Sequence, residues 1–288
     1  VILIRRKEYA MHSELLLNNG FPVRILELEA EGINVIRSKT EIHFNPCINV
    51  IWGVEGLDKT AVIRILENAF FDSKSIRKNI FCSAGEYKIT CSFFKDKTEI
   101  IHNRINGATP YSYGAFQHLH LKKRISNWFV NRTLFFDTDE DITENQKINY
   151  LLARECFSYL NPELSFKGIQ SETGNVIINT PGGKIPFDYL SFEYQNCICQ
   201  IHNMIKGAEQ TGRDEDICVS DFRGCILVEE IEDGISPSLQ IQVLDALKKI
   251  FPKTQFIITS SSPYILQSLY SDEIIFVAKD RNGGVQYR

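Results

Sequence analysis

The sequence predicts an α/β fold, with a mostly parallel sheet, flanking helices and an antiparallel β-rich lobe. Buried apolar runs of strand length alternate with amphipathic helical runs over residues 22–70 and again from residue 189 onward. This alternation is typical of a parallel sheet. The apolar runs end in polar residues, and ligands bind at the carboxyl ends of the strands in such sheets. Between the two regions, residues 85–188 read as a mixed lobe, in which residues 165–187 carry the glycine and proline punctuation of a β-rich segment.

The composition is that of a globular protein: 288 residues, 43% hydrophobic and 24% charged. The formal net charge is −4, so any contact with nucleic acid would have to come from a local basic patch. The eight cysteines form no C-x-x-C pair and no cysteine–histidine zinc spacing, which favours free thiols in a reducing cytoplasm. No apolar run reaches the length of a membrane span, so we expect no membrane contact.

Three strands and a helix are expected near the start of the chain. Residues 21–32 and 40–46 alternate apolar and polar side chains, which indicates half-buried strands. Residues 47–52 form a continuous apolar run, which indicates a fully buried strand. The helix that follows is indicated by apolar residues at helical spacing, namely Val62, Ile63, Leu66, Ala69 and Phe70.

The middle of the chain predicts a hairpin, a helix and a group of short strands. Residues 86–94 and 98–105 are expected to pair around Lys95-Asp96-Lys97. Residues 145–160 have the apolar spacing of a helix, and residues 165–187 form the β-rich segment.

The last hundred residues return to alternating helices and strands. Helices are predicted over residues 189–208 and 236–251, the second with Ser236 as its N-cap and Pro237 in its first turn. Buried strands are predicted in residues 225–232, which end in acids, and in 254–263, which end in serines.

A loop of the phosphate-binding type connects the buried strand 47–52 to its helix. The loop Gly53-Val54-Glu55-Gly56-Leu57-Asp58-Lys59-Thr60 matches G-x-x-x-x-G-K-[ST], except that Asp58 replaces the second glycine. In such a loop, backbone N–H groups and the helix N-terminus cradle phosphates, the lysine reaches the β- and γ-phosphates, and the Thr hydroxyl holds Mg²⁺. The sequence therefore predicts a nucleotide site, or the remains of one, at residues 53–60.

Three further segments follow in a fixed order. Residues 190–195 read L-S-F-E-Y-Q, residues 226–230 read I-L-V-E-E, and residues 256–263 read F-I-I-T-S-S-S-P. With the loop at 53–60, they resemble the ABC-type ATPase head of RecF, SMC and OLD-type proteins and of small AAA ATPases of bacterial defence. That family of P-loop NTPases has L-S-x-G-E-Q, a hydrophobic strand followed by Asp-Glu (Walker B), and F-I-x-T-T-H-S-P at these places.

The resemblance covers residues 21–286 and implies one domain over residues 1–288. Within it, residues 21–84 would form a P-loop half, 85–188 a mixed β/helical lobe, and 189–288 a signature and Walker B half. The resemblance also implies ATP and Mg²⁺ as cofactors. The site residues that it implies are Gly53, Gly56, Asp58, Lys59, Thr60 and Ser191 for the nucleotide, Thr60 and Glu229 for the metal, and Glu230 as the catalytic residue that polarises the attacking water.

Four substitutions depart from the family motifs. Asp58 and Glu193 replace glycines, Glu229 replaces an aspartate, and Ser261 replaces the switch histidine that contacts the γ-phosphate. A carboxylate about 5 Å from a phosphate, at an effective dielectric constant of about 20, costs about 3 kcal/mol. We therefore expect a divergent, catalytically impaired head that serves as a structural or regulatory subunit of a complex, as in anti-phage defence. Its partner would be a second copy of the chain or a nuclease, toxin or other effector.

Two alternatives stay open from the sequence. The first is an active Mg²⁺-dependent ATPase coupled to DNA processing or to a nuclease or toxin partner. The second is a DNA-binding module that uses the basic clusters Lys122-Lys123-Arg124 and Lys74, Arg77 and Lys78. Gln117 is a candidate for the family's glutamine between the P-loop and the signature. His118 and His120 lack a third metal ligand nearby, so we expect no metal site there.

Overall fold

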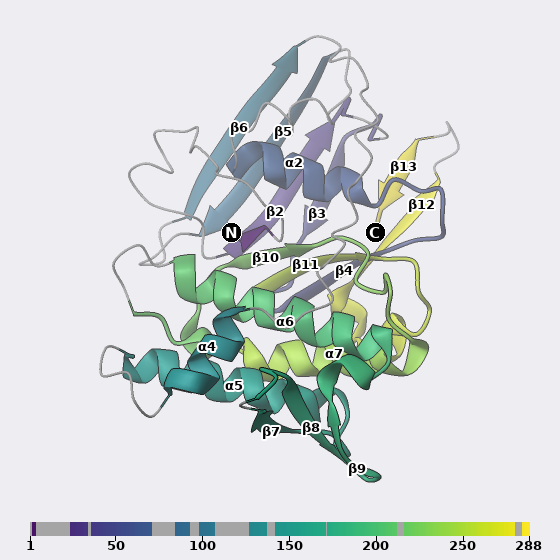
Figure 1. Cartoon of the computed structure of the whole chain (residues 1–288). Helices are drawn as coiled ribbons and strands as arrows, with labels where there is room; N and C mark the ends of the chain where they lie inside the picture. Colours follow the sequence, from purple (N-terminus) through teal and green to yellow (C-terminus); the bar gives the residue numbers. More distant parts are fainter. Residues whose placement is uncertain are drawn as a thin grey trace.

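Over the residues that the structure describes, three β-sheets and four longer helices around the central sheet make up the architecture (Figure 1). The structure is a computed structural model, and it describes residues 2–3, 24–33, 36–70, 84–92, 98–106, 127–136, 142–170, 172–211, 216–279 and 284–288.

The central sheet has the strand order β1-β10-β11-β4-β12-β13. Its first five strands run parallel, and β13 pairs antiparallel with β12. The strands are β1 (Ile2–Leu3), β4 (Ile48–Trp52), β10 (Cys225–Val228), β11 (Gln255–Ser260), β12 (Ile274–Lys279) and β13 (Val285–Tyr287). Every residue of β10 and β11 is buried, because layers cover both faces of the sheet, as in parallel sheets generally. The predicted buried strands are confirmed.

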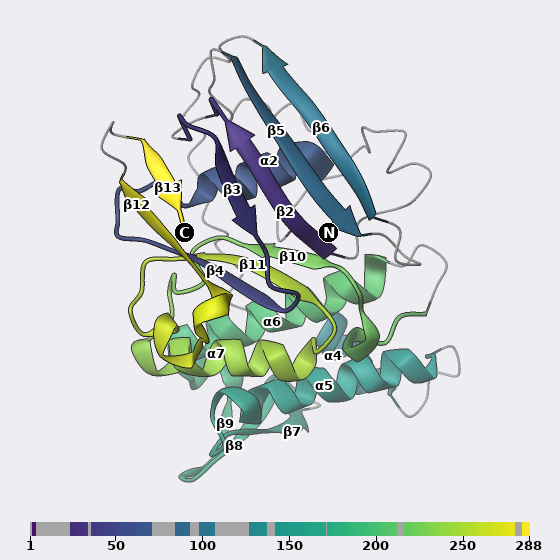
Figure 2. The ribbon, with the colours of Figure 1, turned by 180° about the vertical axis from the view of Figure 1, so that it is seen from behind.

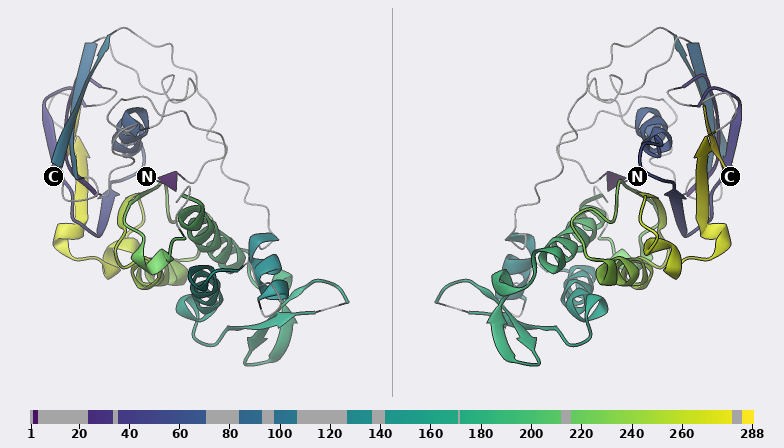
Figure 3. Two further views of the ribbon diagram at one scale, coloured as in Figure 1. Left: turned by 90° about the vertical axis from the view of Figure 1, so that its left-hand side faces the viewer. Right: turned by 90° about the vertical axis from the view of Figure 1, so that its right-hand side faces the viewer.

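Alternate residues of the central strands enter two separate cores. Ile48 and Val50 pack into a core with the helices α5 (Glu144–Leu160), α6 (Phe192–Thr211) and α7 (Pro237–Ile250). Ile51, which directly follows Val50, packs into the other core with α2 (Thr60–Phe70). Successive strand residues point to opposite faces, so each central strand contributes to both layers. Figure 3 shows these layers from the side.

The second sheet is antiparallel and covers α2. Its order is β3-β2-β5-β6, formed by β2 (Arg24–Glu31), β3 (Thr40–His43), β5 (Ala84–Ser92) and β6 (Thr98–Asn106). The hairpin predicted for 86–105 is confirmed as β5 and β6, while residues 93–97 lie outside the described residues. Strand β5 pairs with β2 from Arg24 to Glu31. The boundary that the sequence suggests between a P-loop half (residues 21–84) and a mixed lobe (residues 85–188) therefore lies within this sheet.

The side chain of Gln255 joins the two sheets. It is fully buried at the start of β11. Its Oε1 accepts a hydrogen bond from the N–H of Ile25 at 2.7 Å, and its Nε2 donates to the carbonyls of Ile25 at 2.8 Å and Asn45 at 2.9 Å. A single amide thus satisfies three backbone groups that would otherwise lose their partners inside the protein.

A helical layer and a small sheet lie beyond the central sheet (Figure 2). The small sheet is antiparallel, in the order β7-β8-β9, from β7 (Ser165–Ile169), β8 (Val176–Thr180) and β9 (Gly183–Pro186). It confirms the predicted β-rich segment. The remaining elements are α4 (Asn127–Phe135) and the 3-10 helices η1 (Phe187–Tyr189), η2 (Val219–Asp221), η3 (Ile265–Ser268) and η4 (Ser271–Glu273).

The start predicted for the helix at Ser236 agrees with the structure, whereas the helix predicted over residues 189–208 is observed three residues later, as α6 (Phe192–Thr211). Helix α5 begins with a capping box, in which the Thr143 hydroxyl accepts from the N–H of Gln146 and the Gln146 side chain accepts from the N–H of Thr143. Ser236 is the N-cap of α7 and Pro237 its first residue, as predicted, although the Ser236 side chain makes no capping hydrogen bond.

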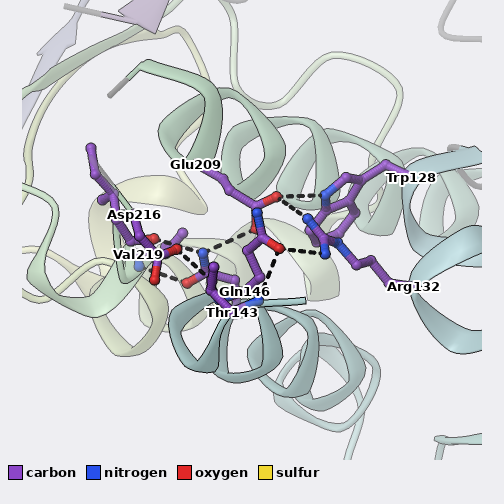
Figure 4. A network of polar contacts seen from close by, with 9 residues as sticks. Trp128, Arg132, Thr143, Gln146, Glu209, Asp216 and Val219 are labelled. Carbon is purple, nitrogen blue, oxygen red and sulfur yellow. Dashed lines mark hydrogen bonds and ion pairs between the residues drawn. The ribbon is translucent and has the colours of Figure 1, made fainter. Parts of the chain in front are cut away.

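A polar network holds α4, α5 and α6 together (Figure 4). Glu209 of α6 is its centre, because its carboxylate accepts from Trp128 Nε1 at 3.0 Å, Arg132 Nη2 at 2.9 Å and Asn149 Nδ2 at 3.1 Å. Arg132 also donates to Gln146 Oε1 at 2.8 Å. The Arg132–Glu209 ion pair is largely buried, at 17% and 8% side-chain exposure, and such a pair requires the additional hydrogen bonds that it has here.

Helices α5 and α6 also enclose a buried histidine. His202 Nε2 lies 2.8 Å from the carbonyl of Ala153, and the ring stacks on Phe129. Burial lowers the pKa of His202 from 6.5 to about 4, although the contact with Ala153 opposes this shift. The imidazole is therefore neutral in the folded protein at pH 7.

We expect Gln255→Leu to lower the free energy of unfolding by about 2–4 kcal/mol, because three buried backbone groups would lose their partner. Urea unfolding at pH 7 measures this change. Gln242→Leu on the exposed face of α7 is the matched control, with an expected change below about 0.5 kcal/mol. A loss below about 1 kcal/mol for Gln255→Leu would contradict its role between the sheets.

His202 also predicts a pH dependence of stability. Its folded pKa, about 4, lies below the ordinary 6.5, so the unfolded chain binds the proton first and stability falls as the pH drops from 6.5 to 4. One pKa unit corresponds to about 1.4 kcal/mol, so His202 should account for a loss of about 3 kcal/mol by pH 4. Denaturant unfolding of wild type and His202→Phe between pH 7 and pH 4 should show a shallower slope for the variant. The exposed His43→Gln control should keep the wild-type slope, and parallel slopes for wild type and His202→Phe would refute the assignment.

Candidate nucleotide-binding site

Three polar segments meet at the carboxyl edge of the central sheet. Strand β11 lies between β4 and β10 and pairs in parallel with both. Residues 53–60 and 229–232 follow the ends of β4 and β10, and residues 260–262 begin with the last residue of β11. Hydrogen bonds join both flanking segments to the end of β11: Gly53 N donates to Ser260 O at 3.3 Å, and Glu230 N donates to Thr259 Oγ1 at 2.9 Å. The phosphate loop, the Walker B acids and the switch segment thus lie at one edge.

The loop between β4 and α2 is compact. A Cβ at Gly53 would lie 3.0 Å from Cβ of Val277 and 3.2 Å from its carbonyl oxygen, so a side chain at this position would require β12 to shift by a few tenths of an ångström. Gly56 has φ of +83°, which favours glycine. Within the loop, Leu57 N donates to Val54 O at 3.3 Å. These contacts give the loop a turn that returns the chain to the start of α2.

Lys59 lies at the start of α2 with its ammonium group inside the loop. The residue is 7% exposed, and its Nζ lies 3.5 Å from the carbonyl oxygen of Val54. A buried ammonium needs an anion or several acceptors, and a phosphate held by the loop would supply one. The burial and position of Lys59 therefore fit the lysine of a phosphate site.

Asp58 does not point freely into the loop. Its Oδ1 accepts from the Thr60 hydroxyl at 2.8 Å, and its Oδ2 lies 3.5 Å from Arg64 Nη1 of α2. The Asp58 and Arg64 side chains are only 22% and 16% exposed. The 3 kcal/mol repulsion expected from the sequence assumed an uncompensated carboxylate, and Arg64 offsets part of that charge.

Thr60 keeps the chemistry that a metal site needs. A hydroxyl has one proton and two lone pairs, so donation to Asp58 leaves the oxygen lone pairs open to a cation. Tyr287 of β13 supports the loop from behind, because its hydroxyl donates to the Asp58 carbonyl at 2.9 Å. Burial, with a smaller contribution from Asp58, raises the pKa of Tyr287 and keeps that donor protonated.

The acids after β10 lie on a sharp turn. Glu229 is partly buried and Glu230 is exposed. Glu230 has φ of +48°, a left-handed conformation that costs about 1–2 kcal/mol for a residue with a side chain. The hydrogen bond to the buried Thr259 hydroxyl and a second from Asp233 N to Glu230 O at 2.8 Å hold it there. Backbone strain of this kind clusters at functional sites.

A third acid, Glu232, was not among the site residues predicted from the sequence. Its Oε1 accepts from the N–H of Ser261 at 2.6 Å and from the Ser261 hydroxyl at 2.9 Å. The only signal in the sequence was the third acid in the E-E-I-E run at 229–232, opposite a serine-rich strand end.

The signature segment starts helix α6. The Ser191 hydroxyl accepts from the N–H of Tyr194 at 3.4 Å. The Asn196 amide, one turn into α6, donates to the carbonyls of Asp233 at 3.3 Å and Gly234 at 3.5 Å. The signature helix thus contacts the turn that follows the Walker B acids in the same chain.

Several sequence candidates lie outside the described residues. They are Gln117, His118, His120, the cluster Lys122-Lys123-Arg124 and the cluster Lys74, Arg77 and Lys78.

In the described part of the chain, no helix combines the length and the apolar character that crossing a bilayer requires.

Comparisons with known proteins place the fold. No protein-family model matches the chain. Two solved SMC heads superpose on it. The SMC head domain from Thermotoga maritima has a TM-score of 0.54 and 12% identity, and the superposition covers 92% of this chain and 98% of that one. The Smc head domain from Pyrococcus furiosus, with an extended coiled coil and bound to the C-terminal domain of ScpA, has a TM-score of 0.53 and 11% identity, and the superposition covers 92% of this chain and 95% of that one. The chain has the fold of an ABC-type ATPase head. The fold predicted by the four motifs is confirmed, and nucleotide and Mg²⁺ are the ligands that this fold class binds in general.

A sequence relative aligns with most of this chain. The Septu protein PtuA of Bacillus thuringiensis is 28% identical over 310 aligned positions, which span 92% of this chain and 78% of that protein. The Septu protein PtuA of Bacillus mycoides is 37% identical over 54 residues, 19% of this chain and 8% of that protein.

Proposed function

We propose that the chain is a nucleotide-binding subunit of a Septu-type anti-phage defence complex, in which Mg²⁺–ATP binding controls assembly and hydrolysis is slow or absent. The similarity to PtuA along 92% of the chain supports the assignment to this kind of system. The observation that carries nucleotide binding is the buried Lys59 at the start of α2, in a loop whose extra acid is paired with Arg64.

The residues at the edge of the sheet fit the ligand. The loop backbone and Lys59 would hold the phosphates, and Gly53 and Gly56 would give the backbone the approach and the turn that it needs. Thr60 and Glu229 would hold Mg²⁺ through oxygen atoms, the ligands that this ion prefers. When bound, the ion neutralises phosphate charge and polarises the phosphoryl group.

Slow turnover follows from the charges and contacts of the remaining residues. Asp58 keeps a carboxylate beside the phosphate loop, and Ser261, at the position of the switch histidine, has its hydroxyl bonded to Glu232. Glu193, in place of the signature glycine, would face a partner's phosphates with a second negative charge. The exposed Glu230 is the only one of these groups that retains the family's catalytic residue type.

An active ATPase is the second candidate, and one contact favours it. The Glu230 backbone is fixed in a strained conformation by Thr259, as expected for a residue that has to be positioned. Release of phosphate from ATP by wild type, together with loss of that release in Glu230→Gln, would establish the active ATPase.

The partner is proposed to be an effector subunit, such as a nuclease or toxin, or a second copy of this chain. A solved Smc head is bound to the C-terminal winged-helix domain of ScpA, which shows that a head of this fold can dock another protein. Co-purification of the chain with and without ATP would distinguish nucleotide-controlled assembly from a permanent complex.

We expect wild type to bind Mg²⁺–ATP, and Lys59→Ala to weaken binding about 10- to 100-fold, because one charge-assisted contact contributes about 1.5–3 kcal/mol. Asp58→Gly should tighten binding about tenfold, since Arg64 already offsets part of the repulsion. Calorimetric titration with Mg²⁺–ATP measures the dissociation constants of wild type, Lys59→Ala and Asp58→Gly. The control is Lys253→Ala, a lysine paired with Asp221 and preceding β11 at the opposite edge of the sheet.

The control should bind like wild type. Binding that survives Lys59→Ala unchanged would show that the nucleotide lies elsewhere. Binding that weakens in Asp58→Gly would contradict the repulsive role of Asp58.

A further inference from the structure

Glu232 connects two of the three segments at the site. It belongs to the turn after β10, whereas its hydrogen-bond partner Ser261 follows β11, so the contact links residues 29 positions apart. Ser260, the neighbour of Ser261, accepts the hydrogen bond from Gly53 N at 3.3 Å. Contacts therefore run continuously from Glu232 through the switch segment to the first residue of the phosphate loop.

The two carboxylate oxygens of Glu232 differ in their surroundings. Oε1 accepts two hydrogen bonds from Ser261, at 2.6 and 2.9 Å. Oε2 is buried and has no hydrogen-bond partner among the described residues. Leaving a buried carboxylate oxygen unsatisfied is costly, and such an atom calls for a functional explanation.

The charges around Glu232 indicate which donor would satisfy Oε2. Glu229, Glu230 and Asp233 lie in the same turn, so four carboxylates gather within five residues. Lys59, the buried cation of the site, already contacts the Val54 carbonyl. Acids in this number favour a bound cation, and Mg²⁺ usually keeps several of its water ligands in proteins. Those waters are hydrogen-bond donors.

We propose that Glu232 is a positioning residue of the nucleotide site: Oε1 fixes Ser261 at the place of the switch histidine, and Oε2 accepts a hydrogen bond from the hydration shell of the nucleotide's Mg²⁺. This inference rests on the proposed function, since it requires Mg²⁺–ATP to bind at this edge. Residues that hold metal ligands in place from outside the coordination sphere change metal affinity about 10- to 100-fold when mutated.

The test measures binding with and without the metal, so it does not depend on turnover. The dissociation constant of a non-hydrolysable ATP analogue is determined by calorimetry in Mg²⁺ and in EDTA, and the ratio of the two constants reports the contribution of the metal. In Glu232→Gln, the amide oxygen can keep the contacts of Oε1, but an NH₂ group that cannot accept replaces Oε2. We expect the ratio to fall about tenfold, with the affinity in EDTA nearly unchanged.

Two further variants make the result specific. Asp233→Asn removes the same charge from an exposed neighbour and should keep the wild-type ratio. Glu232→Asp shortens the side chain and should lower the ratio while keeping the charge, and it serves if Glu232→Gln folds poorly.

The outcomes separate this inference from the proposed function. An unchanged ratio in both Glu232 variants, with wild type binding the analogue, overturns the role of Glu232 and leaves nucleotide binding standing. An equal fall of the ratio in Asp233→Asn would show a general charge effect, and this result would also overturn the role of Glu232. A wild type that does not bind the analogue overturns both proposals together.

Discussion

The parallel pairing of β11 with both β4 and β10 is the constraint on which the site depends. Because the three strands run in the same direction, their carboxyl ends reach one edge, and the segments that follow them meet there. The phosphate loop, the acids and the switch serines come from positions as far apart in the chain as Gly53 and Ser261, yet Gly53 and Ser260 share a hydrogen bond. Buried side chains on both faces fix this strand order, and Gln255 attaches the second sheet to it.

The central physical question at this edge is how a loop with added carboxylates would accept the polyanion that we propose as its ligand. The structure provides two local answers. Asp58 is held by Thr60 and Arg64, so its charge is directed into the start of α2. Glu232 is held by Ser261, so one of its oxygens is occupied. In both cases a hydrogen-bond donor lies beside the acid, so neither carboxylate is left without a partner at this edge.

The sequence was sufficient where a local pattern determines the structure. The buried runs gave β4, β10 and β11, and the spacing of Gly53, Lys59 and Thr60 located the loop between β4 and α2. The sequence was insufficient where side chains meet across long separations. The contact of Gln255 with Ile25 spans 230 positions and that of Glu232 with Ser261 spans 29, and neither can be inferred without the strand order. Arg64 follows Asp58 by nearly two helical turns, so its pairing depends on how the loop enters α2.

Hydrogen–deuterium exchange of the wild-type chain, with and without Mg²⁺–ATP, tests most directly whether this edge of the sheet is a nucleotide site. The account predicts slower amide exchange on binding in residues 53–61, 229–232 and 259–262, because the phosphates and the metal would order these three segments together. Nucleotide binding that leaves the exchange of all three segments unchanged, or that protects only residues away from this edge, would contradict it.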